Sequence, residues 1–418
     1  MAGWTMRVAA LVAASSPCLA AAEGSVVASA LAESKPILDA RVRYEMVEQT
    51  PLPQDANAET LRLRAGAETG KAWNTTLLVE GEIVSGLGGD YREDSSRQRD
   101  LAYPVVADPD SQEINRLQLV NTSLPGTTLT LGRQRIALDD QRFVGNSAWR
   151  QNEQTFDAVR VVNKSIPALT LDATYLDQVN RSFGRDSPQG RYRGNGMLGN
   201  VAYQFSFGKL TGFAYLLDFD SIATLPVALN PVRASTDTRG ARFSGERPLS
   251  RFKVSYAASY ARQSDYGDNP SNFDLGYHSV ELAGTYRQYT VTLGQEVMQG
   301  NGTVGFATPL GTMHRFHGWA DKFLVTPVNG IDDRYASVSY QAKGVGRLDT
   351  VSAIVTYRDL RSERLALDLG AEVDLLLQAK YQRFVASLKY ARYEANEGAT
   401  PVAYQDTRKF WAQLEYVW

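Results

Sequence analysis

The sequence has 418 residues and is nearly neutral, with 44 Lys and Arg against 46 Asp and Glu and a net charge of −2. This balance argues against a nucleic-acid binder, which would carry a basic excess. A hydrophobic content of 43% argues against a disordered chain. Beyond the first 22 residues there is no run of about 18 apolar residues, which excludes a helical membrane protein. Soluble enzymes and β-barrels remain.

Residues 1–22 have the pattern of a secretory signal peptide, and we expect the folded protein to comprise residues 23–418. Arg7 precedes the apolar stretch 8–14, and small residues follow at 20–22. We expect cleavage after Ala22, with Ala20 as the alternative. The single cysteine, Cys18, would leave with the leader, so disulfides would not stabilise the exported chain.

Downstream of the leader, apolar and polar residues alternate, which is the period of a β-strand and not of a helix. The pattern starts in 37–47 and recurs at 61–68, 251–260, 367–378 and 409–418. In the first segment, the apolar face is Leu38, Ala40, Val42, Tyr44 and Met46, and the polar face is Asp39, Arg41, Arg43 and Glu45. Each strand therefore has one apolar and one charged face.

Short turns and long polar loops alternate between these strands, as in outer-membrane barrels with short periplasmic turns and longer external loops. Counting the segments gives about eighteen strands, with sixteen as the alternative. We predict an all-β fold, a transmembrane antiparallel up-and-down barrel. Because lipid cannot satisfy a sheet edge, the strand from Leu38 should pair with the strand that ends at Trp418.

A soluble β-sandwich would also show this alternation, but two features favour the membrane barrel. Tyr or Trp recurs near strand ends on the apolar face, as in an aromatic girdle. The last strand ends on Trp418 with alternate apolar residues before it, which resembles the signal read by the barrel-assembly machinery. We therefore predict a location in the Gram-negative outer membrane, with membrane lipid and that machinery as partners.

The polar faces would line an aqueous lumen, and loops at about 132–157 and 299–332 are expected to fold inward and narrow it. Arg133 and Arg135 have the parity of Leu131, so either Gly132 is a bulge that turns both inward or both lie above the hydrocarbon. A solvated loop with internal ion pairs is the alternative. The expected constriction residues are Arg133, Arg135, Arg142, Arg150, Asp139, Asp140, Trp149, Glu153, Asp157, Arg160, Arg315, Asp321 and Lys322.

Two stretches resemble the alginate-export family of outer-membrane porins. The first contains Gly132-Arg133-Gln134, 140–146 and 149–157, and the second contains Thr308-Pro309-Leu310, His314, Phe316, 318–323 and Asn329-Gly330. The resemblance implies a monomeric barrel of about eighteen strands with an arginine-rich passage for anionic or hydroxyl-rich solutes. We therefore expect a porin for small hydrophilic, anionic or sugar-like solutes. The alternatives are a plugged surface-binding barrel and an export channel for an anionic polysaccharide such as alginate.

Enzyme chemistry is not expected. His278 and Ser279 are adjacent on a strand, so they point to opposite faces and cannot act as base and nucleophile. His314 and His317 alone do not complete a zinc site, which needs three or four ligands. We predict no catalytic residues, no metal and no cofactor.

Overall fold

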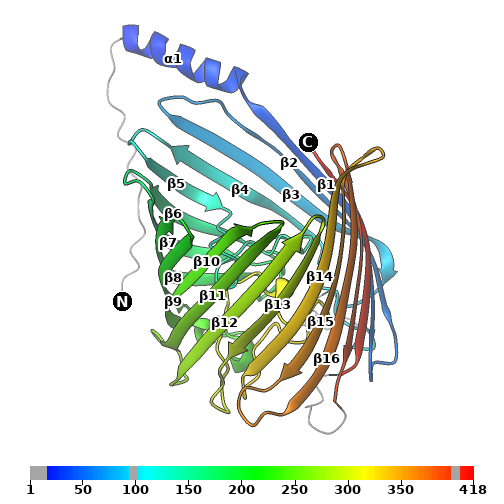
Figure 1. Cartoon of the computed structure of the whole chain (residues 1–418). Coiled ribbons are helices and arrows are strands. Elements are labelled where there is room, and N and C mark those ends of the chain that lie inside the picture. Colours follow the sequence, from blue (N-terminus) through cyan, green and yellow to red (C-terminus); the bar gives the residue numbers. More distant parts are fainter. Residues whose placement is uncertain (1–16, 94–100, 397–404) are drawn as a thin grey trace.

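The computed structural model describes residues 17–93, 101–396 and 405–418, and it is a closed antiparallel barrel of eighteen strands. Figure 1 shows the barrel from the side, with helix α1 (Pro17–Ala32) at one rim. The predicted fold class and the count of eighteen strands are confirmed. The predicted leader residues 1–16 lie outside the described residues. Helix α1 includes Ala20 and Ala22, the two expected cleavage positions.

Every strand pairs with its sequence neighbours. The strands are β1 (Lys35–Gln49), β2 (Ala56–Glu68), β3 (Thr75–Asp90), β4 (Ser111–Asn121), β5 (Thr127–Gln134), β6 (Thr155–Asn163), β7 (Leu169–Asn180), β8 (Arg191–Phe205), β9 (Gly208–Phe219), β10 (Thr236–Leu249), β11 (Phe252–Asp265), β12 (Asp274–Tyr286), β13 (Tyr289–Met298), β14 (Ile331–Val345), β15 (Leu348–Arg361), β16 (Asp368–Tyr381), β17 (Phe384–Glu394) and β18 (Thr407–Val417). Three short 3-10 helices lie in the loops: η1 (Val227–Leu229), η2 (Pro231–Ala234) and η3 (Met313–Arg315).

The barrel closes where the first strand meets the last. β1 pairs antiparallel with β18 from Asp39 opposite Val417 to Gln49 opposite Thr407. The Trp418 amide then donates to the Leu38 carbonyl at 2.9 Å. The predicted closure is therefore confirmed, and it satisfies the backbone groups that an open edge would leave in lipid.

The alternating residues take up two opposite faces, as the sequence predicts. Outward apolar side chains such as Val42, Val280 and Leu414 are exposed in the isolated chain, whereas inward Arg43 and Arg62 are almost fully buried. This distribution, with apolar side chains exposed and charged side chains buried, is the reverse of that in a soluble protein. It suits a wall between lipid and a polar interior. Within the described residues, no helix is both long enough and apolar enough to cross a bilayer.

The short turn between β16 and β17 does not follow from the alternation of residues in the sequence. Gln382 joins β16 to β17 with a φ of +52°, and Arg383 follows it. The alternation along β17 predicts that Arg383 faces the lumen together with Ser387 and Lys389, but its guanidinium lies 3.6 Å from the ring centroid of Trp418 at the rim. That expectation was wrong because a residue beside a turn does not keep the strand alternation.

Candidate constriction and binding pockets

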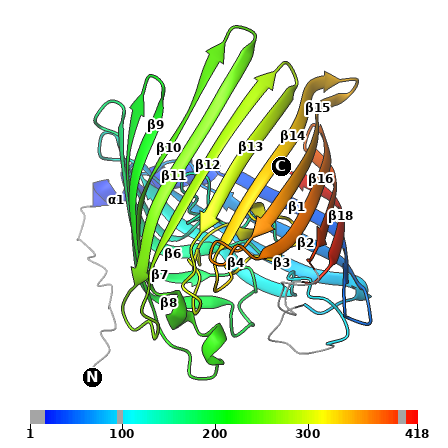
Figure 2. The same cartoon turned by 60° about the horizontal axis from the view of Figure 1, so that its bottom comes forward.

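Two loops that are far apart in the sequence meet inside the barrel. Loop 135–154 joins β5 to β6, and loop 299–330 joins β13 to β14; Figure 2 shows both within the ring of strands. The Gly145 amide donates to the Leu310 carbonyl at 2.8 Å, and the Thr312 amide donates to the Gln141 carbonyl at 2.9 Å. The two loops therefore form one hydrogen-bonded layer across the lumen.

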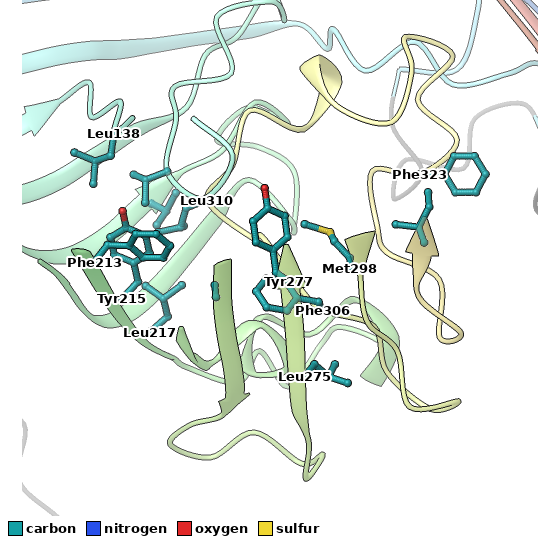
Figure 3. Close-up of a cluster of buried hydrophobic side chains, with 14 of the residues drawn as sticks. Leu138, Phe213, Tyr215, Leu217, Leu275, Tyr277, Met298, Phe306, Leu310 and Phe323 are labelled. Atoms are coloured by element: carbon teal, nitrogen blue, oxygen red, sulfur yellow. The ribbon is translucent and has the colours of Figure 1, made fainter. Parts of the chain in front are cut away.

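Apolar side chains hold this layer against one side of the wall. One buried cluster contains Leu138 of loop 135–154 together with Leu310 and Phe306 of loop 299–330. The same cluster contains Phe213 of β9 and Tyr277 of β12 (Figure 3). Phe306 and Tyr277 have ring centroids 5.7 Å apart. Burial of this area stabilises the folded-in position of the loops, because about 25 cal/mol is gained per Å² of apolar surface removed from water.

Arg142 anchors loop 135–154 to the wall through buried polar contacts. Its Nε lies 2.7 Å from a Glu296 carboxylate oxygen, and its Nη2 lies 2.5 Å from His317 Nε2. His317 Nδ1 is 3.2 Å from Asp333, whose carboxylate also contacts Arg358. Glu296, His317 and Asp333 have ligand atoms within 4.8 Å of one another. Guanidinium groups already provide the positive charge that these carboxylates need.

Asp321 is the centre of a second buried network, which joins both loops to β18. Its oxygens lie 2.6 Å from His314 Nδ1, 2.9 Å from Arg150 Nη2 and 2.9 Å from Lys409 Nζ. Burial opposes ionisation of Asp321, but His314, Lys409 and Arg150 outweigh it and lower the pKa of Asp321 well below the ordinary aspartate range. Burial lowers the pKa of His314 well below its ordinary value.

A cage of tryptophans surrounds Lys389 of β17 beside this network. Its Nζ lies 3.9 Å from the ring centroid of Trp149 and 3.7 Å from that of Trp319, and it is 2.6 Å from His314 Nε2. Trp149 stacks on His314 with centroids 4.8 Å apart and an interplanar angle of 4°. Cation–π contacts of a desolvated ammonium are worth about 2 kcal/mol, so the cage ties both loops to the wall.

Glu153 links the base of loop 135–154 to the neighbouring strands β4 and β3. It accepts from Arg135 at 2.5 Å and from Asn115 at 2.6 Å. Arg135 also lies 3.4 Å from Glu80, which is held by Arg116 at 2.6 Å. Arg135 keeps about a third of its side chain exposed, whereas Arg142 and Arg150 are nearly buried.

The loop layer borders two pockets. The outer pocket, of about 350 Å³, includes residues at the strand ends that adjoin the long loops, such as Gln49 of β1 and Lys409 of β18. Its charged side chains are five cations (Arg92, Arg150, Arg181, Lys322 and Lys409) and one carboxylate, Asp321. It also presents the rings of Trp149 and Phe183. An excess of fixed positive charge in a partly enclosed site attracts anions.

The inner pocket, of about 240 Å³, is lined by mid-strand residues of β11, β12 and β14, such as Ala257, Ser279 and Ser337. It combines both signs of charge. Its charged lining residues are Arg242, Arg315 and Arg358 with Asp140, Glu281 and Glu296. Arg242 lies 2.8 Å from Asp140, whose carbonyl accepts from Arg315 at 3.2 Å.

The remaining expected constriction residues lie on the wall or at its outer surface. Arg160 pairs with Asp172 at 2.5 Å on the inward face, and Asp139 accepts from Lys209 at 3.0 Å. Arg133 and Asp157 pair at 2.7 Å.

The strand pairing at Gly132 shows no register shift, so Arg133 keeps the face of the exposed Leu131. For Arg133 this placement supports the second alternative, whereas Arg135 faces inward, where it contacts Glu153 and Glu80. We leave Arg133 and Asp157 out of the proposed pore lining.

Sequence reasoning did not single out Arg92, Arg181, Lys389 or Lys409 as site residues. Lys389 and Lys409 have inward parity, which was a usable signal. Arg92 and Arg181 lie at loop boundaries, where no periodicity indicates direction. The contribution of Arg92 and Arg181 to the outer pocket is apparent only in the folded structure, where the loops meet.

Comparisons with known proteins agree with this architecture. The chain is similar to OccAB2 of Acinetobacter baumannii, with 17% identity over 93% of this chain and 99% of that one and a TM-score of 0.68. It is similar to OpdK of Pseudomonas aeruginosa, solved with vanillate, with 15% identity, the same coverages and a TM-score of 0.67. OccK2 (OpdF) of Pseudomonas aeruginosa has 15% identity over 93% of this chain and 98% of that one, and a TM-score of 0.67. No curated protein matches the sequence.

The chain thus has the fold of an outer-membrane porin. More particularly, residues 116–265 match the family model described as Alginate export, which confirms the resemblance seen around residues 132–157. The second resembling stretch, 308–330, lies outside the matched range.

Proposed function

We propose that this protein is an outer-membrane channel for small anionic solutes, which enter through the outer pocket. The observation that carries the proposal is the charge of that pocket, where five cationic side chains meet one carboxylate. Arg181 also stacks over Phe183 and Tyr192, with distances of 4.7 and 4.2 Å to the ring centroids, so its guanidinium is held in place. A positioned guanidinium binds carboxylates with defined geometry.

Aromatic carboxylates and uronates are the solute classes that suit this lining. The pocket offers aromatic faces beside the cations, and stacking against a ring favours a planar solute or a sugar. Vanillate, which appears with the structurally similar OpdK, combines a carboxylate with a ring. Passage would proceed from the outer pocket past Arg135 to the inward arginines of the wall.

The test is ion selectivity in planar bilayers under a KCl gradient. The wild-type channel should favour anions, and replacing Arg181 and Lys322 together with Gln should shift the reversal potential towards cations. Lys71→Gln is the matched control, since Lys71 lies in a turn at the other end of the barrel. An unchanged reversal potential in the double variant would remove the outer pocket from the conduction path.

A plugged surface-binding barrel is the second candidate, favoured by the tight attachment of the loops. Apolar burial and the Arg142 and Asp321 networks hold both loops in place. Conductance separates the two functions: stable channels support the porin, and ligand binding without conductance supports the receptor. Liposome swelling with graded uronate oligomers tests the polysaccharide-export alternative.

A further inference from the structure

Exposed arginines lie on the outward face of the barrel near the ends of the strands that adjoin the long loops. Their side chains are 47% to 68% exposed. They are Arg239 of β10, Arg262 of β11, Arg334 of β14, Arg361 of β15, Arg392 of β17 and Arg408 of β18. These residues share the parity of lipid-facing side chains, so they face the membrane and not the lumen.

Outward aromatic side chains mark the depth of these arginines. Arg262 follows Tyr260 by two residues, Arg392 follows Tyr390 by two, and Arg408 precedes Phe410 by two. A two-residue step along a strand is about 7 Å. Aromatic side chains of barrels gather at the membrane interface, so the arginines lie at or just beyond the headgroup level. Since the long loops of such barrels face the cell exterior, this is the outer leaflet.

Two pairs of these arginines are directly opposite each other on neighbouring strands. Arg239 pairs with Arg262 between β10 and β11, and Arg392 pairs with Arg408 between β17 and β18. Directly opposed residues hold their Cβ atoms about 5 Å apart, and like charges in this arrangement are destabilising. A bound anion between the two guanidinium groups would relieve that repulsion.

Each of the four arginines is paired with its own carboxylate. Arg239 uses Nε and Nη2 for Asp237, at 2.9 and 2.8 Å, and Arg262 uses the same two atoms for Asp274, at 3.0 and 2.6 Å. The Nη1 atoms take no part in these bonds. Likewise, Arg392 contacts Glu394, and Arg408 lies 3.4 Å from Glu48.

The opposite rim has a different surface. There Arg383 lies over Trp418, and Arg287 lies 5.3 Å from the ring centroid of Tyr286. Tyr289 and Tyr340 also pack together on that side in a tilted arrangement, with ring centroids 5.1 Å apart. These two arginines contact aromatic rings, whereas the arginines of the outer-rim pairs contact carboxylates.

We propose that the pairs Arg239–Arg262 and Arg392–Arg408 bind the phosphate groups of lipid headgroups in the outer leaflet. Phosphate suits them because guanidinium groups donate charge-assisted bonds to its oxygens, and the Nη1 atoms of Arg239 and Arg262 take no part in the carboxylate contacts. Each pair would hold one phosphate between two neighbouring strands. The two sites lie in separate parts of the barrel wall and would fix its depth and tilt in the leaflet. This inference does not depend on which solute the lumen passes.

The experiment uses the full-length barrel in phosphatidylcholine nanodiscs that contain either diphosphoryl lipid A or its dephosphorylated counterpart. Native mass spectrometry measures the lipid retained on the protein. The wild-type chain should retain the phosphorylated lipid preferentially. The variant R239Q/R262Q/R392Q/R408Q should lose at least about tenfold in retention, since a hydrogen bond to a charged group is worth about 1.5–3 kcal/mol.

The matched control is R251Q/R287Q, which removes two arginines from turns at the other rim. It should retain the phosphorylated lipid like the wild type. Unchanged conductance of the quadruple variant shows that it folds. Equal retention of both lipids, or undiminished retention by the quadruple variant, would overturn the proposal. Displacement of the lipid by millimolar inorganic phosphate would overturn the assignment to a lipid headgroup.

Discussion

At the scale of single residues, the outer pocket depends on a lysine whose charge is easily lost. Burial and the adjacent Lys409 lower the pKa of Lys322 to about 8, although Glu372, Asp321 and Asp406 act in the opposite direction. The pocket therefore loses one positive charge as the pH rises through about 8. A guanidinium at the same position would stay charged.

We predict that anion selectivity in planar bilayers falls between about pH 7 and pH 9, because Lys322 deprotonates in that range. Lys322→Arg should remove this pH dependence, and Lys322→Met should give the high-pH selectivity at every pH. The reversal potential under a KCl gradient is the measurement. A wild-type pH profile retained by Lys322→Arg would assign the titration to another group.

Asp321 is the residue whose loss should cost the most stability in the loop layer. Asp321→Asn leaves Arg150 and Lys409 buried without their shared carboxylate, and such uncompensated charge costs about 3–5 kcal/mol. The loss of stability is measured by thermal unfolding, which is followed through the difference in gel mobility between the folded and the heat-denatured barrel. Asp186→Asn, which removes an exposed loop carboxylate beside Arg185, should cost less than about 1 kcal/mol.

The Asp321 carboxylate also makes the stability of the folded barrel depend on pH. The folded state lowers its pKa, so the contribution is fully present above the ordinary aspartate range and is lost as the pH falls through the depressed folded value. Acidification below about pH 4 should therefore narrow the stability difference between the wild type and Asp321→Asn. A difference that stays constant down to pH 2 would contradict this.

At the scale of elements, the loop layer is held together by a close backbone approach at Gly311. A Cβ there would collide with the carbonyl oxygen of Arg142. Gly311→Val should push loop 299–330 away from loop 135–154 at a cost of about 1–3 kcal/mol and raise single-channel conductance. Gly212→Val is the control, since a Cβ at Gly212 meets open space. Equal conductance in both variants would show that this contact does not limit the pore.

Strands and loops differ in how far the sequence predicts them. A strand face follows from local alternation, so the lipid-facing side of β11 and the β1–β18 closure could be predicted from residues within each segment. Arg142 shows the limit. Its partners Glu296 and His317 lie 154 and 175 residues away, and no periodicity connects a loop to them. Sequence could therefore identify the arginines of loop 135–154, but not which of them are buried.

At the scale of the whole molecule, two polar regions lie on opposite sides of one wall. The inner face carries buried ion pairs such as Arg64 with Glu82, and the outer rim carries exposed arginines such as Arg262. A band of apolar side chains separates the rims on the outside, and its middle includes Val280 of β12, which is 58% exposed in the isolated chain. The barrel therefore needs lipid around this band and water inside it.

This arrangement makes the effect of a new charge depend on which face it occupies. Val280→Arg places a cation in the hydrocarbon and should lower the free energy of unfolding by about 2–4 kcal/mol. Glu281→Arg introduces the same side chain one residue later on the inward face, where it meets the inner pocket, and should cost less than Val280→Arg despite the loss of the contact from the Tyr335 hydroxyl. Equilibrium unfolding in phospholipid vesicles measures both. If Glu281→Arg were the more damaging of the two, the assignment of the lipid-facing and lumen-facing sides of β12 would be reversed.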